Sequence, residues 1–195
     1  TVQCTGKSFN SGAKYEFKGT NTGTFTLSTL NTITGTGSLT FNNVGGTVTL
    51  DQSFTTPNLD LTNNVVTTGA FTLTLSGAAS TVSRTTGWVN GNFNKTITGN
   101  STKTFEIGDA TLYTPVTLDF TGTITAGSIT AKSTIGDHPQ IATSAYNVNR
   151  TVNRFYTLTA SGVVGLASYS PTFNYISTDN DPTAVPANYV IRQYN

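Results

Sequence analysis

Short stretches in which apolar and polar residues alternate dominate the first half of the chain. Between residues 15 and 75 they read "YEF", "TFTL", "SLTF", "TVTL", "LDL" and "FTLTL". Alternation with a period of two is typical of a β-strand with one buried and one solvated face. The inward side chains predicted from this pattern are Phe25, Leu27, Leu39, Phe41, Val48, Leu50, Leu59, Leu61, Phe71 and Leu73.

Equivalent positions in these stretches recur every 20 to 24 residues, which is the length of one coil in a parallel β-solenoid. About three coils fit into this part of the chain. The connecting stretches contain Gly and Asn, which tolerate positive φ at corners. An antiparallel meander would give the same alternation and stays open, although no tight Asn-Gly hairpin turn joins the strands. The recurrences run from Tyr15 to Leu39, Phe25 to Val48, Leu39 to Leu59 and Val48 to Phe71.

The rhythm changes after "SGAASTVSRTTG", where strand candidates become longer, more aromatic and unequally spaced. Seven such strands in roughly 110 residues suit an antiparallel sandwich of immunoglobulin-like size. We therefore expect an all-β chain with a short parallel β-solenoid in residues 1–82 and an immunoglobulin-like sandwich in residues 83–195. The seven candidates are "WVNGNF", "KTFEI", "PVTLDF", "SITAKS", "RFYTLTA", "PTFNYI" and "YVIRQY".

Charge and cysteine content exclude several classes of function. Only 10% of residues are charged, the net charge is +1, and Lys and Arg are scattered, so neither nucleic acid nor an anionic membrane is an expected partner. Cys4 is the single cysteine, so no disulfide can form within the chain. No apolar run approaches the length needed for a membrane span. Since the chain starts at Thr1 without a signal segment, we expect a piece of a longer secreted protein.

Several stretches together resemble a known family. They are "GWVNG" (87–91), "FEIGDATLYTPVTLDF" (105–120), "GDHP" (136–139), "VNRFYTLT" (152–159) and "NYVIRQYN" (188–195). They are similar to the terminal module of large adhesin-like surface proteins of Bacteroidetes, which the type IX secretion system exports. In that family a Gly/Thr-rich β-repeat region precedes an immunoglobulin-like module. The resemblance is strong from about residue 80 onward and only compositional before it.

Two departures from the family pattern stand out. The usual "FPVGD" reads "FEIGD" here, with Glu106 where Pro is common. The C-terminal sorting domain of a complete cargo protein is also missing, which again suggests a piece of a longer chain. The resemblance implies an extracellular location and a stalk or adhesin role, with other segments of the parent protein, neighbouring copies or surface glycans as partners. It implies no catalytic motif and no cofactor.

Acidic residues and the one histidine provide little for catalysis. Glycoside hydrolysis needs two carboxyl groups at a fixed short distance, whereas Glu16, Asp51 and Asp60 fall on different strand units. His138 lies in a loop, and no GxSxG motif supplies a nucleophilic serine. Such a histidine more often bonds a neighbouring turn. We therefore predict no catalytic residue.

Two loop motifs resemble binding or modification sites. Asp179 and Asp181 in "STDNDPT" could supply part of a calcium site, but no glycine or later glutamate completes an EF-hand loop, so a solvated turn is favoured. The glycosylation pattern occurs at Asn94, Asn100 and Asn149, where an Asn/Thr-rich chain produces it by chance. We predict no metal or cofactor site.

Threonine-rich strings such as "TFT", "TVT" and "TLT" raise the possibility of ice binding by ranks of aligned hydroxyl groups. Alignment needs equal coils, yet the spacing between units varies from about nine to fourteen residues. We therefore expect ragged ranks, with the threonines serving as the solvated face of half-buried strands.

Trp88 is the only tryptophan and lies where the repeat rhythm ends. A sugar-stacking platform would need a second aromatic beside it, for which Phe93 and Tyr113 are candidates. Burial at the end of the solenoid, against the sandwich, is the favoured interpretation because a tryptophan adds a large apolar area.

Charged and aromatic residues of the second half complete the expectations. Arg150 and Arg154 are expected to pair with loop carboxylates such as Asp109 or Asp137, and an anion or glycan pocket is the alternative. The aromatics expected in the sandwich core and its margins are Phe105, Tyr113, Phe120, Phe155, Tyr156, Phe173, Tyr175, Tyr189 and Tyr194.

The preferred function is that of a non-enzymatic extracellular structural or adhesive segment of a larger surface or filament-forming protein. The alternatives are a carbohydrate-binding module and, less favoured, a polysaccharide-degrading β-helix.

Overall fold

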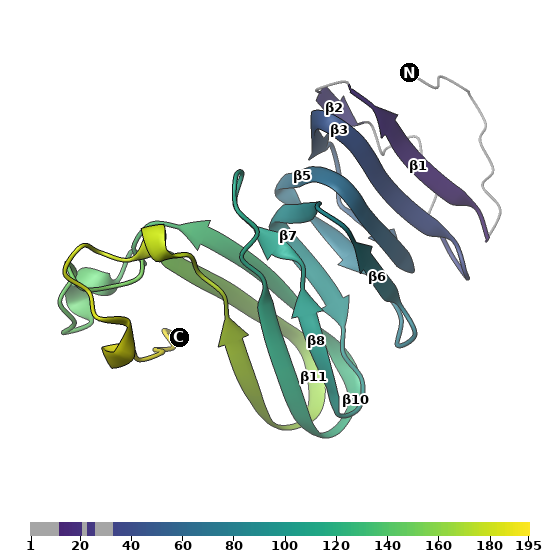
Figure 1. Cartoon of the computed structure of the whole chain (residues 1–195). Coiled ribbons are helices and arrows are strands. Elements are labelled where there is room, and N and C mark those ends of the chain that lie inside the picture. Colours follow the sequence, from purple (N-terminus) through teal and green to yellow (C-terminus); the bar gives the residue numbers. More distant parts are fainter. Residues whose placement is uncertain (1–11, 21–22, 26–32) are drawn as a thin grey trace.

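A computed structural model describes residues 12–20, 23–25 and 33–195 (Figure 1). The fold is all-β, with 59% strand, and the described residues contain no α-helix, only three one-turn 3-10 helices. No described helix is long and apolar enough to span a bilayer. Cys4 and Leu27 lie outside the described residues, and so does the side chain of Phe25. The strands are β1 (Lys14–Gly19), β2 (Gly23–Phe25), β3 (Ser38–Leu50), β4 (Phe54–Thr56), β5 (Asn58–Leu75), β6 (Thr81–Arg84), β7 (Trp88–Thr96), β8 (Ser101–Phe105), β9 (Ile107–Gly108), β10 (Val116–Ile135) and β11 (Arg154–Phe173).

The N-terminal half is a parallel β-solenoid, as the repeat predicts, but it has about four turns where the sequence suggested about three. One face consists of β1, the first part of β3, the first part of β5 and β6, all paired in parallel. Tyr15 lies opposite Leu39, and Leu39 lies opposite Leu59, as expected from the sequence. The antiparallel meander is therefore excluded for these strands, and Val82 adds a further coil opposite Leu59.

A second face stacks β2, the end of β3, the middle of β5, the start of β7, and β9. The predicted alignment of Val48 with Phe71 is wrong, because Val48 lies opposite Val66, which lies opposite Val89. Phe71 is only half-buried. The error arises because β5 continues as one strand around two corners, so its residues are divided among three faces.

Corner residues adopt the conformations expected of Gly and Asn. Asn64 has φ of 90°, Gly45 of 77° and Gly69 of 60°. The pairing of β3 with β5 skips between Asn42 and Thr47, so the extra residues bulge outward at a corner. Coils of unequal length can therefore keep their strands aligned.

The third face leads from the solenoid into the antiparallel part. Phe54 of β4 lies opposite Leu73, and Leu73 lies opposite Phe93 of β7. Phe93 then faces Ala131 of β10, where the pairing becomes antiparallel. The start of β7 also pairs in parallel with β9 at residues 107–108. Strand β7 therefore takes part in both the parallel solenoid and the antiparallel ribbon. The boundary after residue 82 stays a prediction.

The structure of residues 83–195 does not confirm the expected immunoglobulin-like sandwich. "PVTLDF" and "SITAKS" are two parts of the continuous β10, and "RFYTLTA" and "PTF" are two parts of β11. The last candidate, "YVIRQY", is not a strand, and Val190, Ile191 and Tyr194 in it are exposed. Because "TGTITAG" and "SGVVGLA" are strand-compatible, they extend each strand through the place where the sequence suggested a loop.

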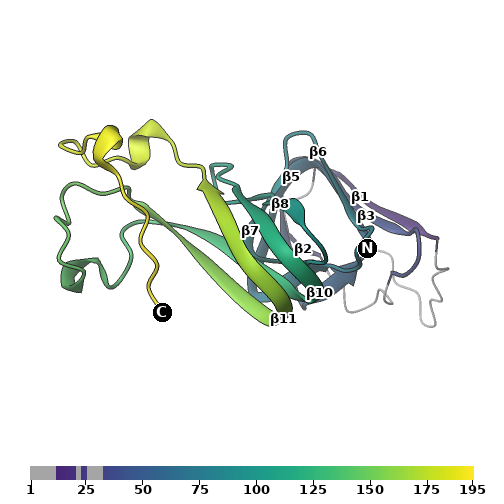
Figure 2. The same ribbon diagram turned by 90° about the horizontal axis from the view of Figure 1, so that it is seen from below.

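The long ribbon of β10 and β11 folds back on itself, with the bend at its lower end in Figure 1 and the same ribbon seen from below in Figure 2. Val116 pairs with Phe173, and Ser133 pairs with Tyr156. The rings of Tyr156 and Phe173 nevertheless lie 4.8 Å apart, so the two ends of the ribbon meet. The first part of β10 pairs with β8 and the last part with β7, which gives two packed antiparallel layers.

A single hydrophobic core runs from the solenoid into the folded ribbon. Phe93 and Phe105 are fully buried and pack edge to face with centroids 6.4 Å apart. Of the predicted inward residues, those whose burial is confirmed are Leu39, Phe41, Val48, Leu50, Leu59, Leu61 and Leu73. Tyr175 and Tyr194 are 40% and 66% exposed, so they do not belong to the core.

Candidate functional site

Trp88 points out of the solenoid, because its neighbour Val89 faces the core in the alternating pattern of β7. Its indole Nε1–H donates to the backbone oxygen of Asp109 at 2.7 Å. A Cβ on Gly108 would lie 2.9 Å from the indole, so the ring packs closely against that backbone. The expectation that Trp88 plugs the end of the solenoid is wrong. The half-buried indole instead pins the 108–113 loop to the outer surface of β7.

Asp109 links this loop to a buried guanidinium. Its Oδ1 accepts hydrogen bonds from the backbone N–H groups of Thr111 at 2.7 Å and Leu112 at 2.9 Å. Its Oδ2 accepts from Arg154 Nη2 at 2.8 Å. Burial alone would raise the pKa of Asp109, but the hydrogen bonds from Thr111, Arg154 and Leu112 lower it below its ordinary value.

Arg154 is the centre of the arrangement, and its side chain is fully buried. Its guanidinium contacts Asp179 through Nε at 2.7 Å and Nη2 at 3.1 Å, in the bidentate geometry that suits a carboxylate. Nη1 donates to the hydroxyl groups of Thr114 at 3.2 Å and Ser133 at 3.1 Å. Burial lowers the pKa of Arg154, but the hydrogen bonds to Asp179 and Asp109 raise it overall.

These residues form one connected unit, which we call the Arg154 network: Trp88, Asp109, Thr114, Ser133, Arg154 and Asp179. It joins β7, the 108–114 loop, both strands of the ribbon and the C-terminal loops. The predicted pairing of Arg154 with Asp109 is present, and the second partner, Asp179, was not expected. Every donor of the guanidinium is directed at a neighbouring oxygen, and both carboxylates accept hydrogen bonds from it, which suits bracing better than proton transfer.

The calcium motif contributes to the same region through hydrogen bonds. Asp179 binds Arg154, and Asp181 accepts from the backbone N–H of Thr151 at 2.7 Å and from Asn153 Nδ2 at 2.9 Å. Hydrogen bonds from Thr151 and Asn153 lower the pKa of Asp181. No cluster of three or more metal-ligating side chains occurs among the described residues. The loop oxygens therefore act as acceptors that fix the C-terminal segment.

The remaining loop residues are dispersed. His138 Nδ1 accepts from the backbone N–H of Gln140 at 3.2 Å, and the ring packs against Phe155 and Tyr194 with centroids 5.0 and 5.3 Å away. Arg150 is exposed and forms no ion pair with any described residue, so its predicted pairing is wrong. The three asparagines of the glycosylation pattern differ in exposure, since Asn94 is half-buried whereas Asn100 and Asn149 are exposed.

Acidic side chains of the solenoid lie on its outer surface. Glu16 and Asp60 both face Thr40 of the intervening strand, so they are two strand spacings apart, about 10 Å. Thr40 Oγ1 donates to Asp60 at 3.0 Å. Asp51 lies in the corner after β3, and Glu106 binds a lysine. None of these pairs matches the enclosed carboxyl pair of a glycosidase.

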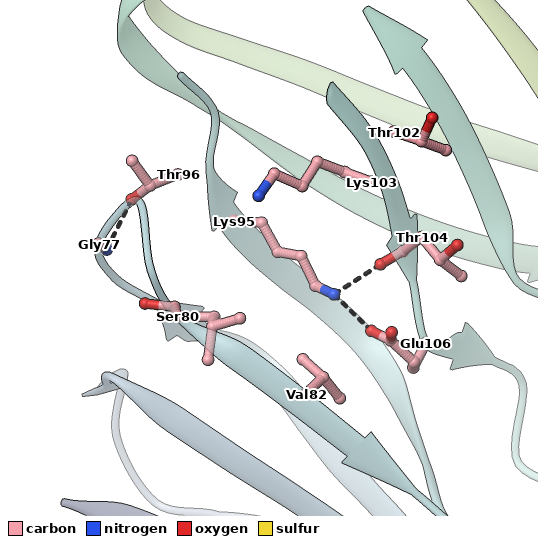
Figure 3. A pocket seen from close by; sticks show the side chains of 10 residues that line it. Gly77, Ser80, Val82, Lys95, Thr96, Thr102, Lys103, Thr104 and Glu106 are labelled. Atoms are coloured by element: carbon pink, nitrogen blue, oxygen red, sulfur yellow. Dashed lines mark hydrogen bonds and ion pairs between the residues drawn. The ribbon is translucent and has the colours of Figure 1, made fainter. Parts of the chain in front are cut away.

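A small pocket of about 150 Å³ opens between β6 and β8, where the two strands separate (Figure 3). Lys95 occupies an inward position of β7 and reaches into this gap, where its Nζ binds the backbone oxygen of Thr104 and lies 2.6 Å from Glu106 Oε2. Burial lowers the pKa of Lys95, partly opposed by Glu106. The Lys95 side chain fills part of the space between Val82 of β6 and strand β8. The volume of the pocket is below that of most ligand-binding sites.

The outward threonines are aligned, which corrects the expectation of ragged ranks. Thr49, Thr67 and Asn90 lie opposite one another across three strands. Corner bulges absorb the unequal spacing, so the hydroxyl groups keep their register. A second row crosses the solenoid and continues over the ribbon through Thr55, Thr74, Asn94, Thr130 and Thr159.

Beside Trp88, the structure brings together a pair of aromatic rings and a guanidinium. Tyr113 lies 6.3 Å from Trp88 between centroids, and Arg84 stacks on Tyr113 with Cζ 3.5 Å from its centroid. Burial raises the pKa of Tyr113, partly opposed by Arg84. Phe93, the other aromatic considered as a partner, is buried in the core instead. We call Arg84, Trp88 and Tyr113 the aromatic cluster.

Comparison with known proteins adds no relative. No family model matches the chain, and no curated protein or solved structure matches it significantly.

Proposed function

We propose that this chain is a non-enzymatic structural or adhesive segment of a larger extracellular protein, located at a cell surface or in a filament. The observation that carries the proposal is the Arg154 network. The buried ionic groups join loops and strands into one braced unit, with both carboxylates fully engaged by donors. Such bracing suits a rigid spacer, whereas catalysis needs an acid or base free to exchange a proton.

The surface supports the same proposal. Aligned rows of hydroxyl and amide groups cross two faces, and only 10% of residues are charged, so the segment presents a polar exterior of low charge. The Bacteroidetes surface-protein resemblance supplies the proposed location and the proposed partners, which are neighbouring segments of the parent protein, other copies and surface glycans. We also propose that the folded ribbon takes the place of that family's immunoglobulin-like module, supported by its two packed antiparallel layers.

The location can be tested on intact cells that produce the parent protein. An antibody against this segment should label unpermeabilised cells, and protease added outside should remove the signal while a cytoplasmic marker survives. Labelling that requires permeabilisation would refute the extracellular proposal. A bracing role predicts in addition that purified segment hydrolyses none of a panel of polysaccharides, and release of reducing sugar would refute the non-enzymatic part.

Carbohydrate binding is the second candidate, favoured by the aromatic cluster. Sugar rings stack on aromatic faces, and Arg84 adds donors beside Tyr113. Trp88 and Tyr113 are each half-exposed, so a sugar would cover their outer surfaces while the Trp88 N–H keeps its bond to Asp109.

Titration of oligosaccharides against wild type and Tyr113→Ala tests this candidate. Loss of binding in Tyr113→Ala, with binding retained in Tyr175→Ala, would support it, because Tyr175 is 40% exposed in a different loop. Equal binding by both variants would remove the aromatic cluster as the contact. Circular dichroism of each variant confirms that the fold is kept.

A further inference from the structure

The outer edge of β11 is open. β11 pairs with β10 along one side and with no other described strand, so the backbone N–H and C=O groups of its other side have no strand partner. Thr157, Thr159, Ala160 and Ser161 are exposed, and no described loop forms a backbone hydrogen bond with residues 155–161. An uncovered edge is a template for pairing with another strand.

Most of this edge lacks the features that normally prevent such pairing, and its one proline, Pro171, lies near the end of the strand. Residues 155–173 contain no charged side chain. The other edge strands longer than three residues carry charge, with Lys14, Glu16 and Lys18 in β1, Arg84 in β6 and Lys103 in β8. Edge charges and prolines are the usual protection against edge-to-edge association.

Within β11 the first part is the better pairing surface. Residues 155–161 read "FYTLTAS", with neither Gly nor Pro, whereas Gly162, Gly165 and Pro171 interrupt the second part. We call residues 155–161 the β11 edge. Its inward side chains Tyr156 and Leu158 are partly buried against the margin of the core, so an added strand would cover apolar surface as well as satisfy hydrogen bonds.

We propose that the β11 edge pairs antiparallel with the same residues of a second copy, about a two-fold axis. A second copy fits because any two-fold register along this segment places only uncharged residues opposite one another. Threonines then meet on the outer face and Tyr156 and Leu158 lie on the inner face, and both sheets continue across the axis. This inference goes beyond the proposed function and holds whether or not the segment is adhesive.

Sedimentation velocity over a range of concentrations tests the proposal. Wild type should shift from monomer toward twice the monomer mass as concentration rises. Thr159→Lys/Ser161→Lys should weaken association at least about tenfold, because the symmetric pairing brings four like charges together on one face, while Thr130 and Ser128 opposite them in β10 are uncharged. Ser168→Lys/Thr172→Lys is the matched control, since it adds the same charge to exposed positions in the second part of β11 that also lie opposite uncharged residues, and it should dimerise as wild type does.

Hydrogen exchange provides the second readout, with protection of residues 155–161 expected to rise with concentration in wild type and in the control. The proposal is overturned if wild type stays monomeric at its highest soluble concentration, if it forms open-ended polymers, or if both lysine pairs weaken association equally. If the purified segment stays monomeric while antibody still labels it at the cell surface, the proposed pairing is refuted and the proposed function is not.

Discussion

Arg154 shows how one side chain can organise distant parts of this chain. Its guanidinium contacts residues from the 108–114 loop, β10 and the C-terminal loop within 3.2 Å. Two carboxylates share this single cation, and the backbone N–H groups at Asp109 supply the remaining stabilisation. A buried ion pair gains little over an apolar pair of the same shape, but removing one partner leaves the other charge without compensation.

Arg154→Met should therefore lower the free energy of unfolding by about 3–5 kcal/mol, because Asp109 and Asp179 stay behind in a buried setting. Urea denaturation followed by circular dichroism measures this change. Arg150→Met is the control, since that exposed side chain has no ionic partner among the described residues and should change stability by less than about 0.5 kcal/mol. Equal effects of the two substitutions would contradict the bracing role.

At the scale of elements, the ribbon of β10 and β11 depends on glycines at its bend. Gly165 has φ of 83°, and a Cβ there would lie 1.9 Å from the backbone oxygen of Thr123. Gly122 and Gly127 are similarly crowded by the opposite strand, at 2.4 and 2.6 Å. The two strands thus approach so closely at the bend that no side chain fits between them.

Gly165→Ala and Gly162→Ala separate backbone strain from this close approach. Gly162 has φ of 59° with nothing within 4 Å of a Cβ, so alanine there should cost only the left-handed conformation, about 1–2 kcal/mol. Gly165→Ala should cost a further 1–3 kcal/mol or so, because the strands must move apart. Thermal melting of the two variants measures the difference. Identical melting temperatures would mean that the bend opens without resistance.

The solenoid was predictable and the ribbon was not, for different physical reasons. Alternation and the recurrence from Tyr15 to Leu39 to Leu59 follow from side-chain burial, which the sequence pattern reports directly. The bend in β10 depends on where β10 and β11 approach each other closely, which the sequence does not report. In the sequence, a glycine inside a Thr-rich strand cannot be distinguished from a glycine in a turn. Arg154 and Asp109 could be paired from charge alone, but Asp179 could not, because its loop returns to the ribbon only after folding.

For the molecule as a whole, β7 prevents a clean division into two parts. It pairs with β5 in the solenoid and with β10 in the ribbon, and Phe93 contributes to the core on both sides. The Arg154 network adds a second connection on the outer surface. Separating the parts would require opening a shared strand as well as this network.

Unfolding should therefore be a single cooperative transition. Trp88 fluorescence reports on the junction between solenoid and ribbon, and far-ultraviolet circular dichroism reports on the strands of the whole chain. Both signals should give the same unfolding midpoint in urea. Residues 1–82 and 83–195 expressed separately serve as the control and should each fail to reach the cooperativity of the full chain. Two resolved transitions in the full chain would instead support independent domains.

The outward bulges at the solenoid corners also bear on how such a chain can be lengthened or labelled. Gly45 has open space around it and Val44 is 61% exposed, while the strands on either side keep their pairing with β5. Extra residues placed at this corner would project into solvent, and their entropic cost grows only slowly with length. An epitope tag or a fluorophore-bearing peptide can accordingly be grafted there, which leaves the stacked faces intact and makes the segment traceable on its parent protein.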